Sequence, residues 1–395
     1  MSQSLNAIHG RAVGRNGLLR DLNHRAVYEQ LANEGPASRA DLARRLELSA
    51  ASVGRVVEGL IRAGLVEEGE RVAGGVGRPQ TLLHVNARAG LVAGMSIRSK
   101  SMRLHLSDLA GTIVARAQVE RTDAGIDALA GQMRDLVLQT RAAHAPELKL
   151  ASLVVGISGV WDESDRQVYA APNLSILEGV DARTLFHAAL SEHIRPESVQ
   201  VDNDINLAAL GEWEHGAATG VDNFFYLSLG SGIGGAAVIS GSLYRGLRGF
   251  AGELGYLPVH VGGRLRSLEQ VIGRRALEEF AAHAGLPVPG GEVFGYLANQ
   301  ASDHDDIADY VTEALGQALV AVVVTLNPRL IVLGGGVGRY GSVWIERIRE
   351  RLNGFVPIVP SIVSTELGRE ASLMGAVGLG RNIARSTLLA LELAA

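Results

Sequence analysis

Apolar strands alternate with helices over most of this chain, and this alternation constrains its fold more than any other feature. Each predicted strand is a short apolar or alternating run, and helical segments separate several of the runs. Such alternation is typical of an α/β domain. The predicted strands are 91–97, 102–106, 151–157, 198–201, 224–229, 236–239 and 330–333, and the predicted helices include 124–143 and 307–326.

The first 90 residues follow a different pattern. Ser38 and Ser49 stand at N-cap positions, and Glu47-Leu48 form a tight turn between two helices. This order is typical of a helix-turn-helix unit, and a hairpin with a glycine-rich tip after it reads as a wing. The expected elements are helices over 21–34, 39–46 and 49–63 and two strands around a tip at 74–79.

This N-terminal head has the arrangement of a DNA-binding domain, in which the second of the two short helices enters the major groove. Arg55 is the best candidate for a base edge, because a guanidinium can form two hydrogen bonds with guanine. Arg39 and Arg44 are expected at phosphates and Arg78 in a narrow minor groove. The expected DNA-binding residues are Arg39, Arg44, Ser49, Ser52, Arg55 and Arg78. The alternative is a dimerisation or packing module.

Charge is distributed unevenly along the 395 residues. Residues 1–90 contain 12 arginines, no lysine and 9 acidic residues, whereas the remainder has a net charge of −8. A basic head on an acidic body favours nucleic acid as the partner of the head; a solvated arginine-rich surface is the alternative. The chain has no cysteine, which excludes disulfides and thiolate metal sites. It shows neither a secretory signal nor an apolar run of about 20 residues, so we expect a cytoplasmic protein without a membrane partner.

Polar residues follow a predicted strand at Asp202–Asn206. A carboxylate and an amide at the carboxyl end of a strand can hold the hydroxyls of a polyol. Asp204 also stands where a helix N-cap belongs, so helix capping is the alternative from these residues alone. The glycine run at 230–235 matches GxGxxG, but a strand follows it instead of the helix that a dinucleotide fold requires.

These segments resemble the ROK family, which contains bacterial sugar repressors and sugar kinases. SRADLARRLELSAASVGRVVEGLIRAGLVEEG and GRPQTLLHVN resemble its repressor branch, Asp202–Asn206 its NDxN signature, and GLRGFAGELGY at 246–256 its GxxGxAGExGH pattern. The resemblance implies an α/β protein with an N-terminal winged helix-turn-helix and a two-lobed, actin-like (ribonuclease H-like) sugar-kinase fold. The implied domains are a DNA-binding domain over 1–90 and a sugar-binding domain over 91–395, with lobe one about 91–202 plus the helix 378–395 and lobe two about 203–377.

The same resemblance implies a set of sugar-binding residues. In the family's kinases, the residue at Asp204 is the general base for a sugar hydroxyl, and the residue at Asn203 binds an adjacent hydroxyl. Tyr256 replaces a family histidine and can still donate a hydrogen bond to a hydroxyl. The implied sugar-binding residues are Asn203, Asp204, Glu253, Tyr256, Glu269, Gly159 and Asn173, of which the last two lie in a segment that resembles GIPGPVD…PN.

Two other family motifs are altered in this sequence. The zinc loop CxCGxxGCxE aligns with 260–269, where His260, Gly262 and Ser267 replace the cysteines, so we expect no zinc and no other cofactor. The kinase motif GxDxGGTK aligns with 94–101, where Ser96 stands at the aspartate and Arg98-Ser99 stand at two glycines. Phosphoryl transfer depends on positioning and charge stabilisation. We therefore expect no kinase activity and assign no catalytic residue.

Together these features predict a sugar-responsive transcription regulator, in its simplest form a repressor. Its head would bind operator DNA, and its cleft would bind a monosaccharide or small glycoside. The resemblance implies a homodimer or homotetramer on a pseudo-palindromic operator. Two alternatives stay open. Asp204, Glu253 and Glu269 favour an active ATP-dependent sugar kinase with a DNA-binding head, whereas Tyr256 and the altered zinc loop favour a DNA-binding protein with a non-functional sugar pocket.

Overall fold

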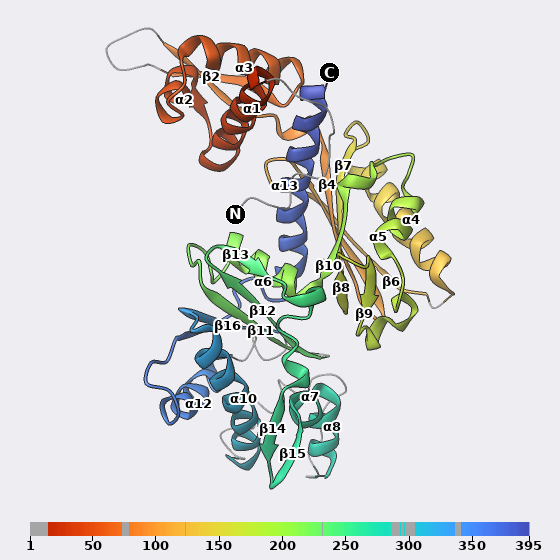
Figure 1. Ribbon diagram of the computed structural model, residues 1–395. Coiled ribbons are helices and arrows are strands. Elements are labelled where there is room, and N and C mark those ends of the chain that lie inside the picture. Colours follow the sequence, from red (N-terminus) through yellow and green to blue (C-terminus); the bar gives the residue numbers. More distant parts are fainter. Residues whose placement is uncertain are drawn as a thin grey trace.

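The computed structural model describes residues 15–394, with gaps at 73–78, 123, 231, 284, 286–292, 294–295, 297–304 and 336–340. Figure 1 shows a head at the top and two α/β lobes below it. We call the part before residue 87 the head. Lobe one is built on the sheet that contains residues 91–97, and lobe two is built on the sheet that contains residues 224–229.

The head is a winged helix-turn-helix, as predicted. Ser38 and Ser49 cap its two short helices. The turn between these helices is tight because Glu47 adopts a φ of 54° and the N–H of Leu48 donates to the carbonyl of Ala43. The elements are α1 (Arg15–Glu34), β1 (Ala37–Ser38), α2 (Arg39–Arg45), α3 (Ala50–Arg62), β2 (Val66–Val72) and β3 (Gln80–Val85). Arg78 and the expected wing tip at 74–77 lie outside the described residues.

Lobe one has a five-stranded sheet in the order β10-β7-β4-β5-β6, in which β10, β7 and β4 are parallel. Side chains at alternate positions of β4 face opposite sides of this sheet. Leu91, Ala93 and Met95 share a core with residues of α4 and α5, whereas Val92 shares a core with residue Ala384 near the C-terminus. The elements are β4 (Leu91–Ile97), β5 (Ser101–Asp108), β6 (Ile113–Glu120), α4 (Ile126–His144), β7 (Leu150–Ile157), β8 (Val160–Asp162), β9 (Gln167–Tyr169), α5 (Ala182–Ala189) and β10 (Val199–Asn203).

Lobe two has a second five-stranded sheet in the order β13-β12-β11-β16-β17, flanked by helices (Figure 1). The helix α6 covers it on the side of lobe one and joins the two sheets. The elements are α6 (Asp204–His215), β11 (Phe224–Leu229), β12 (Ile233–Ile239), β13 (Ser242–Tyr244), β14 (Pro258–Val261), β15 (Arg264–Ser267), α7 (Leu268–Ile272), α8 (Arg274–His283), α10 (Asp305–Leu326), β16 (Leu330–Gly334), α12 (Gly341–Asn353) and β17 (Ser361–Ser364).

One helix is more apolar than the sequence analysis allowed. The 18 residues Asp309–Leu326 of α10 have a mean hydropathy of 1.3, enough by length and composition to cross a membrane. Half of that window is buried within the structure, where Leu315 and Leu319 pack into the core of lobe two. A helix buried in a core is apolar for this reason, and one such helix is weak support for a membrane span.

The last helix, α13 (Ala371–Ala394), connects all three parts of the molecule. It begins seven residues earlier than the expected helix over 378–395 and packs against β4, β7 and α6. In Figure 1 it runs as a blue rod from the lobes to the head. Near its C-terminal end, Leu389 is 4% exposed and belongs to the hydrophobic core of the head.

Candidate functional site

Three parallel strands of lobe one end side by side at the boundary with lobe two. Ile97 of β4 and Asn203 of β10 both pair with Ile157 of β7, so the three residues form one row across the sheet. Arg98 and Asp204 directly follow this row. The carboxyl ends of parallel strands are where ligands bind in α/β folds, so the strand register itself places these two side chains at a candidate site.

Asn203 holds the start of α6 in place. Its Oδ1 accepts a hydrogen bond from the N–H of Ile205 (2.7 Å), and its Nδ2 donates to the carbonyl of Gly159 (2.9 Å). Asn203 is therefore the N-cap, and the helix-capping interpretation of Asp204 was wrong by one residue. Asp204 is the first residue of α6, and Asn203 rather than Asp204 makes the cap.

Asp204 and Glu253 form the electrostatic centre of the site. Burial raises the pKa of Asp204 above its usual range, and the positive charge of Arg98 partly opposes this effect. Burial also raises the pKa of Glu253 to about 7, and the negative charges of Asp204 and Glu269 add to this shift. Because the charges of Asp204 and Glu269 act on the pKa of Glu253, the three carboxyl groups lie near one another, although they come from separate segments of the sequence.

Glycines let the loop of Glu253 lie on the sheet of lobe two. Gly252 has a φ of 89°, and a Cβ at this position would lie 2.0 Å from the carbonyl oxygen of Gly235. That carbonyl belongs to β12, and the N–H of Gly235 donates to the carbonyl of Gly252 (2.7 Å). No side chain fits at Gly252, so the loop must pass close to the strand and carry Glu253 to the site.

Glu269 lies on the other side of the Glu253 loop. Its Oε2 accepts a hydrogen bond from the N–H of Ile233 (2.8 Å), and burial raises its pKa. A Cβ on Gly255 would lie 3.4 Å from the same Oε2. Two glycine-rich segments of lobe two, 230–235 and 246–256, therefore approach this carboxylate. It can accept hydrogen bonds from a ligand while the backbone fixes its position.

The remaining expected sugar-binding residues are more loosely connected to this centre. Gly159 contacts Asn203 through its carbonyl, and a Cβ on Gly159 would lie 2.7 Å from Cβ of Ala171. Asn173, two residues further on, is half-buried at the start of a short 3-10 helix. Tyr256 is 63% exposed, and the centroid of its ring lies 5.5 Å from that of Phe250.

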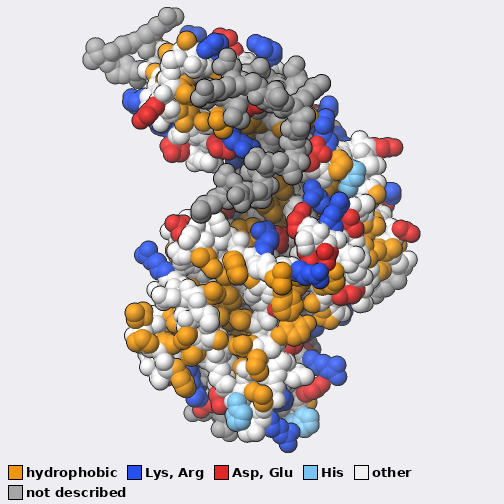
Figure 2. Space-filling view, viewed as in Figure 1, with side chains coloured by type: hydrophobic (Ala, Val, Ile, Leu, Met, Phe, Trp, Pro, Cys, Tyr) orange, Lys and Arg blue, Asp and Glu red, His pale blue; other side chains and the backbone are white. Residues whose placement is uncertain are grey.

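Figure 2 shows hydrophobic side chains gathered over lobe two in this view.

The segment that aligns with the family's zinc loop is held together without a metal-ligand set. Gln317 of α10 accepts a hydrogen bond from the N–H of His260 and donates one to its carbonyl, both at 2.9 Å. Ser267 caps α7 in a capping box with Gln270. Within the described residues, no group of three potential metal ligands occurs. The residues present do not fit a zinc site, and its absence stays a prediction.

The first phosphate loop of the family's kinases is replaced by a tight turn. Ser96 is 2% exposed, and its Oγ has no hydrogen-bond partner among the residues that the structure describes. The N–H of Arg98 donates to the carbonyl of Ser101 (2.9 Å), which closes the turn. A buried hydroxyl cannot organise a metal ion as a carboxylate does, and Arg98 and Ser99 carry exposed side chains where the kinase motif has glycine. These residues do not fit the phosphates of a nucleotide.

Two arginines that no sequence motif indicated join the lobes near the site. Arg245, after β13, forms an ion pair with the buried Asp202 at the end of β10. The Nε of Arg248 lies 3.5 Å from Oδ2 of Asp162 on β8, and its Nη2 lies 3.0 Å from Oδ2 of Asp165. Their partners are more than 40 residues away in sequence, so no local pattern could have revealed these pairs. These three ion pairs hold the loop of Glu253 against lobe one.

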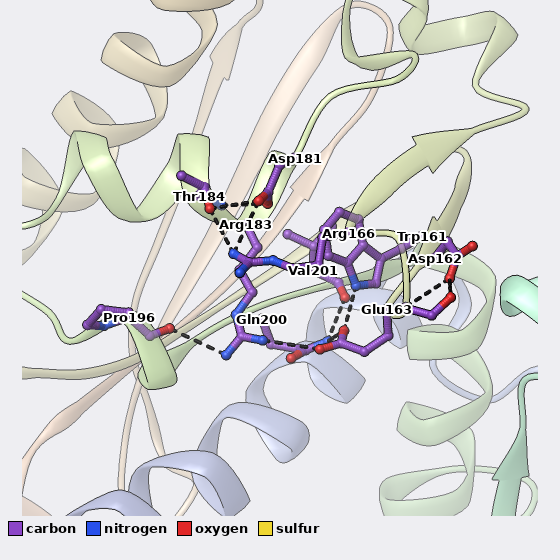
Figure 3. Close-up of polar contacts among 11 residues, drawn as sticks. Trp161, Asp162, Glu163, Arg166, Asp181, Arg183, Thr184, Pro196, Gln200 and Val201 are labelled. Atoms are coloured by element: carbon purple, nitrogen blue, oxygen red, sulfur yellow. Dashed lines mark hydrogen bonds and ion pairs between the residues drawn. The ribbon is translucent and has the colours of Figure 1, made fainter. Parts of the chain in front are cut away.

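Figure 3 shows how the hairpin β8–β9 is fixed on lobe one. The indole N–H of Trp161 donates to Glu163 (2.7 Å), which also pairs with Arg183 (3.1 Å). Arg166 donates to Thr184 on α5 (2.7 Å). These arginines are already paired, so they support the hairpin and the position of Asp162 rather than offering an anion site.

The head presents α3 with an exposed face. Arg55 is exposed, and no hydrogen bond or ion pair of its side chain occurs among the described residues. Ser49 and Ser52 contact each other at the N-terminus of the helix (2.9 Å). Arg44 pairs with Asp41 but stays 75% exposed, whereas Arg39 pairs with Glu68 of the wing (2.9 Å). Arg39 would thus have to exchange a partner to reach a phosphate.

Comparisons with known proteins agree with this architecture. The ROK family model matches residues 92–382, and a MarR family model matches residues 24–75. The xylose repressor of Caldicellulosiruptor bescii is 24% identical over 365 residues, which cover 86% of this chain and 90% of that protein. A solved ROK family transcriptional regulator, a homologue of the E. coli MLC protein, has a TM-score of 0.77 at 22% identity and covers 95% of this chain and 99% of that chain.

A solved ROK hexokinase from Thermus thermophilus is 27% identical, with a TM-score of 0.60, and covers 73% of this chain and 96% of that chain. The match to the hexokinase spans less of this chain than the matches to the two regulators. Because the ROK family model spans most of the sequence, from β4 to α13, the chain belongs to the ROK family.

Proposed function

We propose that this chain is a sugar-responsive transcription repressor, which binds operator DNA with α3 and a sugar at the carboxylates between its lobes. The observation that carries the proposal is a winged helix with an exposed second helix on a ROK body whose first phosphate loop is replaced. The xylose repressor of Caldicellulosiruptor bescii matches across both parts. A repressor needs the head and a ligand site, but no phosphoryl transfer.

The helix α13 supplies a physical route between the two sites. Asp204 begins α6, and the backbones of α6 and α13 touch: a Cβ on Gly375 would lie 1.8 Å from the carbonyl oxygen of Leu207. Arg381 of α13 pairs with Glu214 of α6 (3.0 Å), and Leu389 enters the core of the head. A ligand that moves α6 would therefore move α13 and the head with it.

Binding to DNA tests the first half of the proposal. The full chain is titrated against a DNA fragment from the region around its own gene, with an unrelated fragment of equal length as control. We expect specific binding, and we expect Arg55→Ala to weaken it about tenfold or more, because one bidentate base contact contributes about 1–3 kcal/mol. Arg62→Ala, at the far end of the same helix, is the matched control. Equal affinity for both fragments would contradict the proposal.

We also propose that the chain acts as a homodimer or homotetramer, since two heads can then read a pseudo-palindromic operator. The mass of the protein–DNA complex by light scattering tests this directly. A complex with one chain per operator would contradict it.

Sugar phosphorylation is the second candidate function, because Asp204, Glu253 and Glu269 are all retained. A coupled assay of ADP release across common hexoses decides between the two. We expect no turnover above background, since Ser96 and Arg98 do not form a phosphate loop. Sustained ADP release that Asp204→Ala abolishes would establish a kinase instead.

A further inference from the structure

The strand β6 forms the open edge of the sheet of lobe one. It is the last strand in the order β10-β7-β4-β5-β6 and pairs with β5 on one side only. With eight residues it is longer than the other strands that end the two large sheets, β10, β13 and β17, which have five, three and four residues. A long edge presents backbone N–H and C=O groups that can pair with a strand of another chain.

The register with β5 determines which backbone groups of β6 point outward. The N–H of Arg121 donates to the carbonyl of Lys100, next to β5. Hydrogen-bonded and non-hydrogen-bonded pairs alternate along antiparallel strands. The N–H and C=O groups of Arg116, Gln118 and Glu120 therefore point away from β5. We call these three residues the outer row.

The side chains of the outer row are exposed on one face of the sheet. The alternate residues of β6 point to the other face, into the core that contains α4. Arg116 lies in one cross-strand row with His105 and Gly94, and a Cβ on Gly94 would lie 2.8 Å from the side chain of Val377 in α13. The outer row is thus on the side of α13, but this helix packs on β4, β5 and β7 and leaves the outer row exposed.

The charges of the outer row select one way in which two copies of β6 can pair. In an antiparallel pair centred on Gln118, Arg116 of each copy lies opposite Glu120 of the other, so the favourable contact occurs twice. Moving the centre by one residue loses this contact, and moving it by two places Arg116 or Glu120 opposite its own copy. Within its own chain, Arg116 also acts on the charge of Glu370, but that carboxylate is already paired with Arg103 and His105.

The other face of this edge is hollowed beside α4. Val119, Gly131 and Gln132 are among the residues of β6 and α4 that line a cavity of about 450 Å³ there. A Cβ on Gly131 would meet nothing within 4 Å. Gln132 fixes the end of the strand, because it donates to the carbonyl of Glu120 (2.6 Å) and accepts from the N–H of Thr122 (3.2 Å). The two-fold axis of such a strand pair is perpendicular to the sheet, so both α4 helices lie on this face, where the hollow leaves room for them.

We propose that β6 is an interface between two copies of this chain, which pair antiparallel about Gln118 and join their lobe-one sheets into one continuous sheet. The proposal rests on the proposed function, because it assigns a surface to the proposed association of copies. Backbone hydrogen bonds of the outer row hold the two strands together, and the contacts between Arg116 and Glu120 determine their register.

Sedimentation velocity of the full chain without DNA tests the interface by exchanging its charges. Arg116→Glu and Glu120→Arg each place like charges opposite one another, and we expect each to raise the dissociation constant between copies about tenfold or more and to halve the mass seen for the wild type. The double variant restores opposite charges and should regain the wild-type mass. Glu192→Arg, at an exposed position elsewhere on lobe one, is the control and should not change the mass. Wild-type thermal midpoints would show that the variants fold.

The register has its own test, because the chain contains no cysteine. Gln118→Cys should give a disulfide-linked dimer on mild oxidation, since residues opposite each other in a hydrogen-bonded pair have Cα atoms about 5.5 Å apart, within the range that a disulfide spans. Val114→Cys is the matched control on the same face of the same strand. In the proposed register it lies about 27 Å from its own copy, and it should stay unlinked.

Several results would overturn the proposal. An oligomer whose mass is the same in the wild type and in both single variants associates through another surface, which leaves the proposed homodimer or homotetramer intact. A double variant that stays dissociated, or Val114→Cys that links as readily as Gln118→Cys, would contradict the pairing about Gln118. A wild-type chain that is monomeric in solution would contradict this proposal and leave the edge to a strand of a different protein, while oligomerisation on DNA, DNA binding and sugar binding can still be measured separately.

Discussion

The environment of Glu253 departs clearly from that of an ordinary carboxyl group. In the unfolded chain its pKa returns to about 4.5, whereas in the folded chain it is about 7. Between these values the folded state holds a proton that the unfolded state releases. The stabilisation from this proton is therefore present below about pH 4.5 and lost as the pH rises to about 7.

We expect the thermal midpoint of the wild-type chain to fall more between pH 5 and pH 8 than that of Glu253→Gln. The two chains should differ by at most about 3 kcal/mol in how much their free energy of unfolding changes over this pH range, since each unit of pKa shift corresponds to about 1.4 kcal/mol. Glu192→Gln removes an exposed carboxylate on lobe one and serves as the control, with a profile like that of the wild type. Parallel profiles for the wild type and Glu253→Gln would mean that the carboxyl group is not desolvated.

For individual residues, the sequence predicted those roles that depend on neighbours a few positions away in the chain. The caps Ser38 and Ser49 were predicted because capping depends on residues three positions apart. The cap of α6 was assigned to the neighbouring residue, since Asn203 and Asp204 are both good cap residues and only the contact with Gly159 distinguishes them. The assignment of Asn203, Asp204, Glu253, Tyr256, Glu269, Gly159 and Asn173 to sugar binding stays a proposal.

At the scale of elements, the packing of α6 on α13 determines how the site is connected to the rest of the molecule. Gly211 faces the carbonyl of Ala371 on one side of the crossing, and Gly375 faces the carbonyl of Leu207 on the other. Glycine at both positions lets the two helix backbones touch, which no larger residue permits. Neither the helical periodicity nor the family motifs indicated this contact, because it joins segments about 160 residues apart.

Gly375→Ala should destabilise the lobes by about 1–3 kcal/mol or more, because its Cβ would lie 1.8 Å from the carbonyl oxygen of Leu207. Gly131→Ala is the matched control: Gly131 lies within α4, and a Cβ there would meet nothing within 4 Å. The control should be neutral or up to about 1 kcal/mol more stable, as expected for alanine in a helix. Chemical unfolding measures both, and equal stability of the two variants would show that the helices can separate without cost.

Leu389 tests whether α13 transmits the signal. Leu389→Ala removes a side chain from the core of the head, and we expect it to reduce the effect of sugar on DNA affinity by at least threefold. Sugar affinity should stay the same, because the site lies at the other end of the helix. Ser386→Ala, at an exposed position of the same helix, should behave like the wild type. Full sugar response in Leu389→Ala would mean that the signal travels by another route.

At the scale of the whole molecule, the protein is a head joined to two lobes by the chain segment 86–90 and by the helix α13 (Figure 1). The α/β character and the winged helix-turn-helix were predictable, because strand alternation and caps are local. The ion pairs of Arg245 and Arg248, the hairpin β8–β9 and the reach of α13 were not, because they depend on how distant segments fold together. These long-range features are also the ones that connect the lobes to each other and to the head.

Control of DNA binding by a sugar is tested most directly by the affinity of the full chain for its operator DNA with and without that sugar. Thermal shift first identifies a sugar that stabilises the wild type but not Asp204→Ala. With that sugar at saturation, we expect a change of about 5- to 150-fold in the dissociation constant for operator DNA, the usual range of allosteric coupling. An unchanged dissociation constant, with the sugar shown to be bound, would contradict it.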